Sequence, residues 1–365
     1  MWFLIYFVVI IYAMLTLSAA LLFFLKGKKR LSKFSDVGEG FNLLIAVRNE
    51  ESKIESLFKT IKQLKGLKKV VIVNDHSEDA TVSLIESHLS AHSHITLLNL
   101  HKTEQGKKYA IKLGLSQFTF HEKVLIFDAD NSINEHYTDA VTSFQKNINL
   151  RLMPVWPKAE HPTWFVKLAQ METAGTWGIN AILAHFLFPI SANGANMMLH
   201  QGDWIEAVDW KFNTASGDDL AILKAAIQNS KKIEVEIDVQ YLVDSDEALN
   251  FTDFVARRVR WVSKPFSLFS SLAIIVGALV LISNLSMYYF LILVLMGNWL
   301  SLNFILLKLF CDLMITYMVF KRWNKPFNLL SFTVLWWVYP AVLIWIGFRK
   351  ITSNQSWKGR KLKSV

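Results

Sequence analysis

The chain has 365 residues, of which 52% are hydrophobic and 19% charged, and its mean hydropathy is +0.29. This balance is too apolar for an ordinary soluble protein, and much of the net charge of +9 lies beside apolar segments, which fits anionic lipid headgroups better than nucleic acid. The single cysteine, Cys311, excludes an intrachain disulfide and is expected to be a small core residue, because it lies in an apolar segment.

The first 25 residues form an almost continuous apolar segment that is long enough to span a bilayer. A basic cluster follows within residues 26–39, whereas a signal peptide carries its positive charge before the apolar run. We therefore expect residues 1–25 to be a membrane anchor whose C-terminal side lies in the cytoplasm, and residues 26–39 to be a basic juxtamembrane linker.

A polar block of residues 40–262 follows, and its size suits a single domain. Apolar runs typical of buried strands lie at 41–47, 70–73, 95–98 and 124–127. Helical segments are expected up to about residue 64, at 81–89 and from 107 onward. Strands that alternate with helices predict an α/β fold with a mostly parallel sheet.

Two carboxylates, Asp128 and Asp130, directly follow the strand at 124–127. In an extended chain, side chains two residues apart point the same way, so both carboxylates are able to hold one hard cation. Mg²⁺ and Mn²⁺ prefer such oxygen ligands and often bridge to substrate phosphates. The sequence contains no glycine-rich phosphate cradle of the dinucleotide or P-loop kind. We therefore predict nucleotide-diphosphate chemistry with a metal as the phosphate clamp.

Several short motifs follow one another along the polar block: V47-R-N-E-E51, V73-N-D-H-S-E-D79, G106-K107, D128-A-D130, N193-G-A-N-M197, G217-D-D219 and R257-R-V-R-W261. In type and order they resemble the motifs of the family 2 glycosyltransferases, which have a GT-A fold. The last resembles the family's Q-x-x-R-W motif, but position 257 is Arg where the family has Gln. That departure bears on whether the enzyme adds one sugar or many.

The resemblance implies roles for individual residues on the donor side. The nucleotide-sugar site would comprise Asn49, Glu50, Asp75, Lys107 and Asp128. In the family, the acid that matches Asp75 contacts the uracil of a UDP-sugar, and the acids that match Asp128 and Asp130 bind the metal. Structural roles remain open beside these, since Asp75 is also suited to a helix cap and Lys107 to an ordinary surface position.

On the acceptor side, the resemblance implies Asn193, Gly194, Asp218 and Arg258. Catalytic roles would fall to Asp219 as the general base, to Arg260 beside the diphosphate, and to Trp261. Three alternatives are simpler: Asp218 as an acid favoured by the helix dipole, Arg258 as a ligand of lipid headgroups, and Trp261 as an interface anchor.

The second apolar region, residues 263–348, fits about four transmembrane helices, at about 266–283, 285–300, 301–320 and 328–348, although three spans or a re-entrant pair are also compatible. Four spans return the basic tail, residues 349–365, to the cytoplasm. They leave Lys321, Arg322 and Lys325 on the far side, against the positive-inside tendency.

Two opposite charges, Lys308 and Asp312, lie four residues apart within this apolar region. On a helix they share a face and are able to pair. Charges within a membrane are costly, so they indicate either a structural ion pair between spans or a contact with a lipid headgroup or acceptor.

These observations predict a multi-pass protein of the cytoplasmic membrane whose α/β catalytic domain lies in the cytoplasm. By resemblance, it would be an inverting glycosyltransferase that uses Mg²⁺ or Mn²⁺ to move a sugar from a UDP-sugar to a membrane-embedded lipid or lipid-linked acceptor. A processive polysaccharide synthase and a catalytically silent scaffold that binds a nucleotide-sugar are the competing hypotheses. No nucleic-acid partner is expected.

Overall fold

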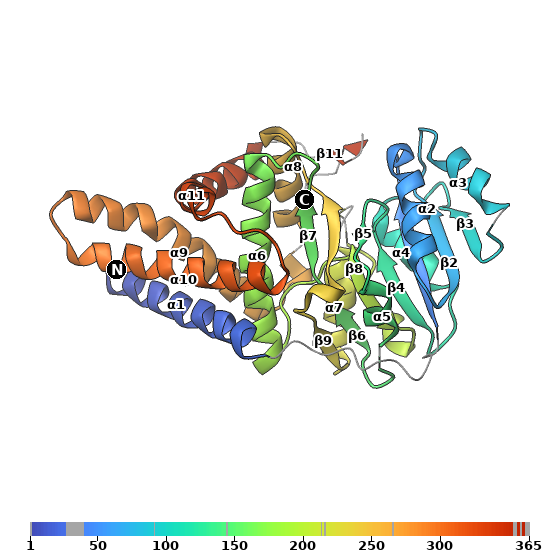
Figure 1. The fold of residues 1–365 in the computed structure, drawn as a ribbon, viewed down its shortest axis with the longest axis horizontal. Coiled ribbons are helices and arrows are strands. Elements are labelled where there is room, and N and C mark those ends of the chain that lie inside the picture. The colour runs from blue at the N-terminus through green and yellow to red at the C-terminus, as the bar shows by residue number, and fades with distance from the viewer. Residues whose placement is uncertain are drawn as a thin grey trace.

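The computed structural model consists of an α/β domain and a bundle of long helices that extends away from it (Figure 1). The residues that it describes are 2–26, 40–90, 92–143, 145–212, 214, 217–264, 266–352, 356–357 and 360–361. The expected juxtamembrane linker beyond residue 26 and most of the expected basic tail lie outside the described residues.

A seven-stranded mixed sheet forms the centre of the α/β domain. Its strands are β1 (Phe41–Val47), β2 (Leu67–Asn74), β3 (Ile95–Asn99), β4 (Lys123–Phe127), β6 (Leu150–Leu152), β8 (Asn196–His200) and β9 (Ile233–Val235). Their order is β3-β2-β1-β4-β8-β6-β9, with β3, β2, β1 and β4 parallel and β8 antiparallel to both of its neighbours. The α/β class and the four predicted strands are confirmed.

The register of the parallel strands brings their carboxyl ends to one edge of the sheet. Val47 at the end of β1 pairs with Asn74 at the end of β2, and Asn74 pairs with Asn99 at the end of β3. Phe127 at the end of β4 lies beside Ile45. The polar residues that follow β1, β2 and β4 therefore leave the sheet at the same edge, where open α/β sheets bind their ligands.

Side chains along each strand point alternately to the two faces of this sheet, and both faces are buried. One face packs against α2 (Ile54–Gln63), with Ile45, Ile72 and Phe127 in the cluster around Phe58. The other face packs against α4 (Lys107–Leu115). Gly114 allows this close approach, because a Cβ atom there would lie 2.0 Å from a methyl group of Leu44.

A small second sheet lies between the seven-stranded sheet and the helix bundle. Its strands are β5 (Ser132–Ile133), β10 (Val243–Asp246) and β7 (Val155–Lys158), in the order β5-β10-β7. Two helices then lead to the bundle, α6 (Trp164–Phe186) and α8 (Phe251–Val262). Strand β10 and helix α8 therefore join the edge of the α/β domain to the bundle (Figure 1).

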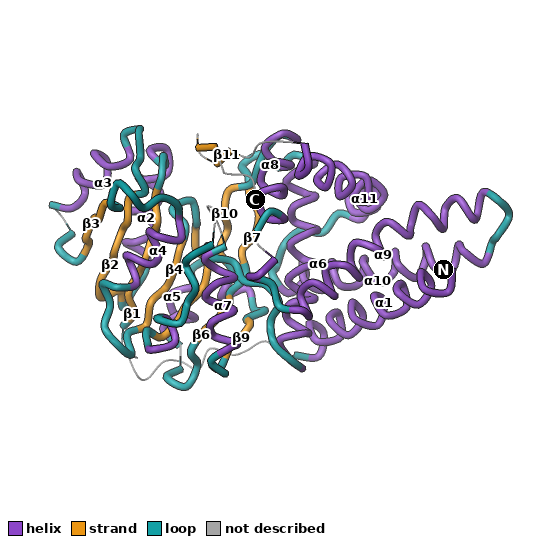
Figure 2. Tube along the Cα trace, turned by 180° about the vertical axis from the view of Figure 1, so that it is seen from behind, coloured by secondary structure: helices purple, strands orange, loops and turns teal. Residues whose placement is uncertain are grey.

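Four helices are long and apolar enough to cross a membrane. They are α1 (Trp2–Leu25), α9 (Ser271–Leu295), α10 (Leu300–Arg322) and α11 (Leu329–Thr352). Helices α1, α9 and α10 run side by side away from the α/β domain, and α6 crosses them at its border (Figures 1 and 2). The N-terminal segment predicted as a span is the helix α1.

Three such helices follow the α/β domain in the described part of the chain, in place of the four expected spans. The sequence interpretation divides 266–300 near residue 284, but α9 continues through this point. Ser283 and Asn284 are buried inside the bundle, where the Asn284 amide donates to the Val280 carbonyl at 2.8 Å and accepts from Lys308 at 3.3 Å. The chain turns only at Gly297, whose φ is +91°.

The basic residues at the end of α10 lie against the α/β domain. Arg322 forms an ion pair with Asp238 at 2.5 Å, and Lys325 forms one with Asp244 of β10 at 2.7 Å. The four-span topology had put these cations on the opposite side from the domain. With α9 as one helix, α10 returns to the domain and the conflict with the positive-inside tendency disappears.

The predicted pairing of Lys308 and Asp312 is present on α10, with Nζ 2.5 Å from Oδ2. Asp312 also accepts from the Tyr12 hydroxyl of α1 at 2.6 Å and from the Trp336 indole of α11 at 2.7 Å. With the contact of Lys308 to Asn284, the pair therefore joins four helices, α1, α9, α10 and α11, as the structural interpretation expects. Cys311 beside it is fully buried, in agreement with a core role.

Candidate active site

Lys107 begins α4 and reaches across the carboxyl edge of the sheet to the loop after β4. Its Nζ atom lies 2.5 Å from Asp128 Oδ1 and 3.3 Å from the Gly194 carbonyl oxygen. Its side chain is only 18% exposed. Burial opposes the charge of this ammonium, but Asp128 and Asp218 outweigh burial and raise the pKa of Lys107 above its usual range. Three predicted site residues, Asp128, Gly194 and Asp218, thus lie around the ammonium group of Lys107.

Gly194 lies at the centre of this group and has no room for a side chain. A Cβ atom there would lie 2.9 Å from Asp218 Oδ2 and 3.5 Å from Lys107 Nζ. The neighbouring Asn193 turns the chain, because its Oδ1 atom accepts from the Ala195 amide at 3.0 Å. The predicted glycine segment and the predicted acidic pair are therefore in direct contact.

Asp218 and Asp219 open helix α7 (Asp218–Gln228), after Gly217 with a φ of +122°. Asp218 is 3% exposed, and its Oδ2 atom has no hydrogen-bond partner among the described residues. Burial, together with the negative charge of Asp219, raises the pKa of the Asp218 carboxyl group. An unpaired buried carboxyl oxygen beside Gly194 is available to a ligand hydroxyl.

Asp219 is paired with a residue that was not predicted, Lys264. The Lys264 ammonium lies 2.8 Å from Asp219 Oδ1 and 3.0 Å from Oδ2, and both side chains are 12% exposed. Asp219 Oδ1 also accepts from the Leu220 amide at 2.8 Å. A carboxylate has about four acceptor positions, so Oδ2 keeps one for an incoming hydroxyl.

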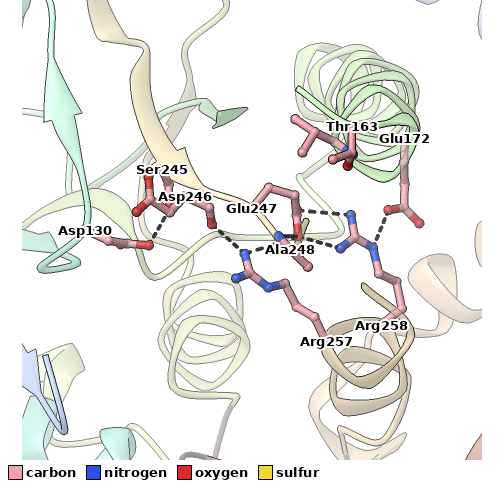
Figure 3. A network of polar contacts seen from close by, with 10 residues as sticks. Asp130, Thr163, Glu172, Ser245, Asp246, Glu247, Ala248, Arg257 and Arg258 are labelled. Carbon is pink, nitrogen blue, oxygen red and sulfur yellow. Dashed lines mark hydrogen bonds and ion pairs between the residues drawn. The ribbon is translucent and has the colours of Figure 1, made fainter. Parts of the chain in front are cut away.

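Asp130 lies apart from the Lys107 contact, on the side of the second sheet. Its Oδ2 atom accepts from the Ser245 hydroxyl at 3.1 Å (Figure 3). Burial, and after it the charges of Asp128 and Glu50, raise the pKa of Asp130 to about 6. Several negative charges are therefore held together at this edge.

The segment carrying the two acids is a turn rather than an extended strand, because the Asn131 amide donates to the Asp128 carbonyl at 3.2 Å. Asp128 therefore faces Lys107, and Asp130 faces Ser245. Within the described ranges, no group of three or more His, Cys, Asp or Glu side chains is placed to hold a metal ion. Two carboxylates fit a cation such as Mg²⁺, which takes its other ligands from water and substrate phosphates.

The loops after β1 and β2 are joined by the predicted nucleotide residues. Asp75 is 1% exposed, and its Oδ2 atom accepts from the Gly106 amide at 3.0 Å, which fixes the start of α4 and hence Lys107. Asn49 has a φ of +50°, and its Oδ1 atom accepts from the Glu78 amide at 2.9 Å. These contacts order the loops, and the binding of a nucleotide by Asn49, Glu50 and Asp75 stays a prediction.

Helix α8 directs one arginine toward the acids. Arg260 is partly buried, and its Nε atom has no hydrogen-bond partner among the described residues. Burial and the neighbouring Arg257 lower its pKa, against the attraction of Asp128, Asp218 and Asp219. This orientation agrees with the expected contact to a diphosphate. Trp261, the next residue, is 41% exposed.

The other arginine of this motif, Arg258, lies inside the protein. Its guanidinium contacts Glu172 of α6 at 2.9 Å and both oxygens of Glu247 at 3.0 and 3.2 Å (Figure 3). It is 3% exposed and also stacks over Phe254 at 3.9 Å. The guanidinium of Arg258 is therefore engaged by internal partners, whereas Arg257 donates to the Asp246 carbonyl at 2.8 Å.

Lys264 had a signal in the sequence that was not used. It lies four residues after Arg260 and two residues beyond the end of α8, so its long side chain is able to reach the site that Arg260 faces. The resemblance to known motifs ends at Trp261, and the prediction ended with it.

Part of the chain is similar in sequence to known glycosyltransferases. Residues 43–191 match the family described as "Glycosyl transferase family 2". The match covers less than half of the chain, and over that segment the chain is similar to the family 2 glycosyltransferases. The match includes Asp75, Lys107, Asp128 and Asp130, whereas the acidic pair on α7 and the arginines of α8 lie beyond its C-terminal end.

A curated relative is the 4,4'-diaponeurosporenoate glycosyltransferase of Staphylococcus haemolyticus, which is 28% identical over 121 residues. That alignment covers 33% of this chain and about a third, 32%, of the relative's length. Among solved structures, the mannosyltransferase PcManGT of Pyrobaculum calidifontis, in complex with GDP-mannose and Mn²⁺, is 14% identical with a TM-score of 0.51. The similarity covers 95% of this chain and 96% of that one, so the GT-A fold is confirmed.

Proposed function

We propose that this glycosyltransferase moves a sugar from a nucleoside-diphosphate sugar, with UDP as the nucleotide, to a lipid or lipid-linked acceptor in the membrane. The observation that carries the proposal is the convergence around Gly194. Acids from two elements, Asp128 after β4 and Asp218–Asp219 on α7, surround this glycine together with Lys107. Such a cluster of opposite charges at the carboxyl edge of the sheet suits a diphosphate, a metal and a reacting hydroxyl group.

On the donor side, Asp128 and Asp130 would hold Mg²⁺ or Mn²⁺ at the diphosphate. The bound cation would act as a Lewis acid that neutralises the charge of the leaving diphosphate. Lys107, which already contacts Asp128, would add a second positive charge there. Arg260, whose Nε atom has no partner among the described residues, would donate to a phosphate oxygen.

On the acceptor side, Asp219 would be the general base. An acceptor hydroxyl oxygen attacks the anomeric carbon, the bond from that carbon to the diphosphate oxygen breaks, and the hydroxyl proton passes to Asp219. One displacement of this kind inverts the configuration at the anomeric carbon. Lys264 would orient the carboxylate, and Asp218 would donate to or accept from a sugar hydroxyl through its unpaired oxygen.

Two observations support an acceptor in the membrane. Four helices of the described chain are long and apolar enough to cross a bilayer, and helix α8 runs from the site toward them. The staphylococcal relative is named as a glycosyltransferase of 4,4'-diaponeurosporenoate. The cations at the end of α10 lie on the domain side, so we place the catalytic domain in the cytoplasm by the positive-inside rule.

The test is nucleotide release by the full-length protein in detergent. The reactions contain a panel of UDP-sugars and GDP-mannose, Mg²⁺ or Mn²⁺, and a lipid extract of the cells that produce the protein. We expect release with one donor, dependent on metal and reduced about 10²- to 10⁴-fold in Asp219→Asn. The matched control is Asp139→Asn, an exposed acid of α5 (Tyr137–Thr142), which should retain activity. Tight UDP binding without release from any donor would favour a silent scaffold.

A further inference from the structure

A cavity of about 100 Å³ that is partly open to the outside lies in the helix bundle, lined by α1, α6, α9, α10 and α11. Its walls are mainly apolar, with Leu168, Ile315 and Phe332 among the lining residues. Four of its five helices are those that are long and apolar enough to cross a membrane. If these helices cross a bilayer, lipid chains surround them, and hydrocarbon is the ligand closest to this cavity.

The size of the cavity sets the kind of occupant. An apolar cavity of about 150 Å³ in another protein stays dry and binds benzene. At about two thirds of that volume, this cavity has room for a short length of chain or one branched unit. Hydrocarbon bound here would therefore be the end or one segment of a longer molecule.

A chain of polar contacts connects this cavity to the acids of the active site. Glu172 and Tyr339 line the cavity, and the Tyr339 hydroxyl donates to Glu172 at 3.0 Å. Glu172 accepts from Arg258, which also donates to Glu247 (Figure 3). Arg258 thus connects Glu172 in the cavity wall to Glu247 in the segment that follows β10.

The remaining steps of this connection lie along β10. Ser245 donates to Asp130, and the next residue, Asp246, accepts from Arg257 through its carbonyl oxygen (Figure 3). Glu247 comes directly after these two residues in the chain. The cavity and the metal-binding acids are therefore joined through three consecutive residues and two adjacent arginines, which places the cavity at the membrane end of the site.

We propose that this cavity holds a hydrocarbon segment of the glycosyl acceptor while the acceptor's hydroxyl-bearing end lies at the catalytic edge. The proposal rests on the proposed function, and it limits the acceptors to lipids with a narrow or branched apolar chain. It also explains Gly175 of α6, which lines the cavity. A Cβ atom at Gly175 would meet nothing within 4 Å, so the glycine leaves space open.

The test fills this space with Gly175→Leu, and with Gly175→Ala for a smaller change. The matched control is Gly277→Leu in α9, where a Cβ atom also meets nothing within 4 Å but which does not line the cavity. We expect at least a tenfold rise in the apparent KM for the lipid extract in Gly175→Leu and a smaller rise in Gly175→Ala. The KM for the donor and the slow donor hydrolysis without acceptor should stay unchanged, and Gly277→Leu should match the unmodified protein.

Two results would overturn the proposal: unchanged transfer kinetics in Gly175→Leu, or an equal loss of acceptor-free donor hydrolysis, which would make the cavity a support of the donor site.

A second measurement separates this failure from failure of the proposed function. A hexadecanoic acid carrying a diazirine is photolysed with the full-length protein, and the labelled peptides are mapped. If α6 and α10 are labelled in Gly277→Leu but not in Gly175→Leu, the probe binds in the cavity, and this result does not require turnover of a donor. Labelling that is equal in both variants would place hydrocarbon outside the cavity and would also overturn the proposal.

Discussion

The ion pair between Lys264 and Asp219 gives the most direct test of the proposed base. The substitution Lys264→Met keeps an unbranched chain of similar length and removes the ammonium. Of the three hydrogen bonds that Asp219 accepts from described residues, the two from Lys264 are then lost and the one from the Leu220 amide is kept. If Lys264 holds the carboxylate in the orientation that accepts a proton, kcat should fall with little change in the KM for the donor.

The geometry sets the size of this loss. The two contacts are 2.8 and 3.0 Å long, and a hydrogen bond to a charged group contributes about 1.5–3 kcal/mol. We take the lower end, about 3 kcal/mol for the two contacts together, because both side chains keep 12% exposure to water. Since each 1.36 kcal/mol changes a rate tenfold, we expect kcat to fall roughly 150-fold.

The assay is nucleotide release by four proteins: the unmodified chain, Lys264→Met, Asp219→Asn and the double variant. If Lys264 acts through Asp219, the double variant should be no slower than Asp219→Asn alone, since residues that act as a unit have non-additive effects. Losses that multiply would refute the reasoning and show that Lys264 acts on the donor independently. Activity in Lys264→Met equal to that of the unmodified chain would also refute it.

Two control variants accompany this cycle. Lys264→Arg keeps the positive charge and should retain most of the activity. Lys224→Met removes a lysine of α7 whose ammonium contacts the Ser267 carbonyl at 2.9 Å and not an acid, so its activity should be unchanged.

Two further predictions concern the acids that we propose bind the metal and the central glycine, Gly194. Because the pKa of Asp130 is about 6, the carboxyl group takes up a proton as the pH falls from 7 to 5, and the Kd for Mn²⁺ measured by calorimetry should rise about tenfold. In Glu50→Gln, which removes a neighbouring negative charge, this loss should move to lower pH. Gly194→Ala places a methyl group 2.9 Å from Asp218 Oδ2 and should lower kcat at least about tenfold, whereas Gly202→Ala, with its nearest contact at 3.4 Å, should not; equal rates would contradict the crowding argument.

Local patterns were sufficient to predict the frame of the domain. The strands of the parallel half are continuous apolar runs, and each ends in polar residues, as at Val47–Arg48 and Phe127–Asp128. Since parallel strands in one sheet bring these ends to one edge, the position of Asp75 and Asp128 at that edge followed from order along the chain. The contact of Lys107 with Gly194 did not, because Gly194 precedes the antiparallel strand β8. The helix α1 was predicted just as directly, because a bilayer span needs only length and hydrophobicity.

Contacts between distant segments were not predictable from these patterns. The partner of Asp219 lies 45 residues further along the chain, and Glu172 lies 86 residues before Arg258. Helix α6, which supplies Glu172, has no counterpart among the expected elements. The sequence therefore predicted Arg258 as a surface or acceptor-side cation. In the structure, packing against α6 encloses Arg258 between the carboxylates of Glu172 and Glu247.

The sequence interpretation and the structure differ in the number of spans because of one buried side-chain amide, that of Asn284. A break near residue 284 gives two segments of about 27 and 24 Å, both shorter than the hydrocarbon thickness of about 30 Å. A single helix over Ser271–Leu295 spans about 37 Å, but it must bury Asn284 within the bundle. Lys308 of α10 makes that burial possible by donating to the Asn284 carbonyl oxygen. The same lysine neutralises Asp312, so one polar cluster keeps α9 continuous and holds α10 against it.

This continuity fixes where the basic end of α10 lies. An uninterrupted α9 leaves the α/β domain and turns at Gly297, and α10 then returns, so that Arg322 and Lys325 contact Asp238 and Asp244 of the domain. The positive-inside rule applied to these cations gives the same side as the basic cluster that follows α1. Two independent groups of charges, at opposite ends of the sequence, therefore agree on the side of the membrane that holds the proposed catalytic edge.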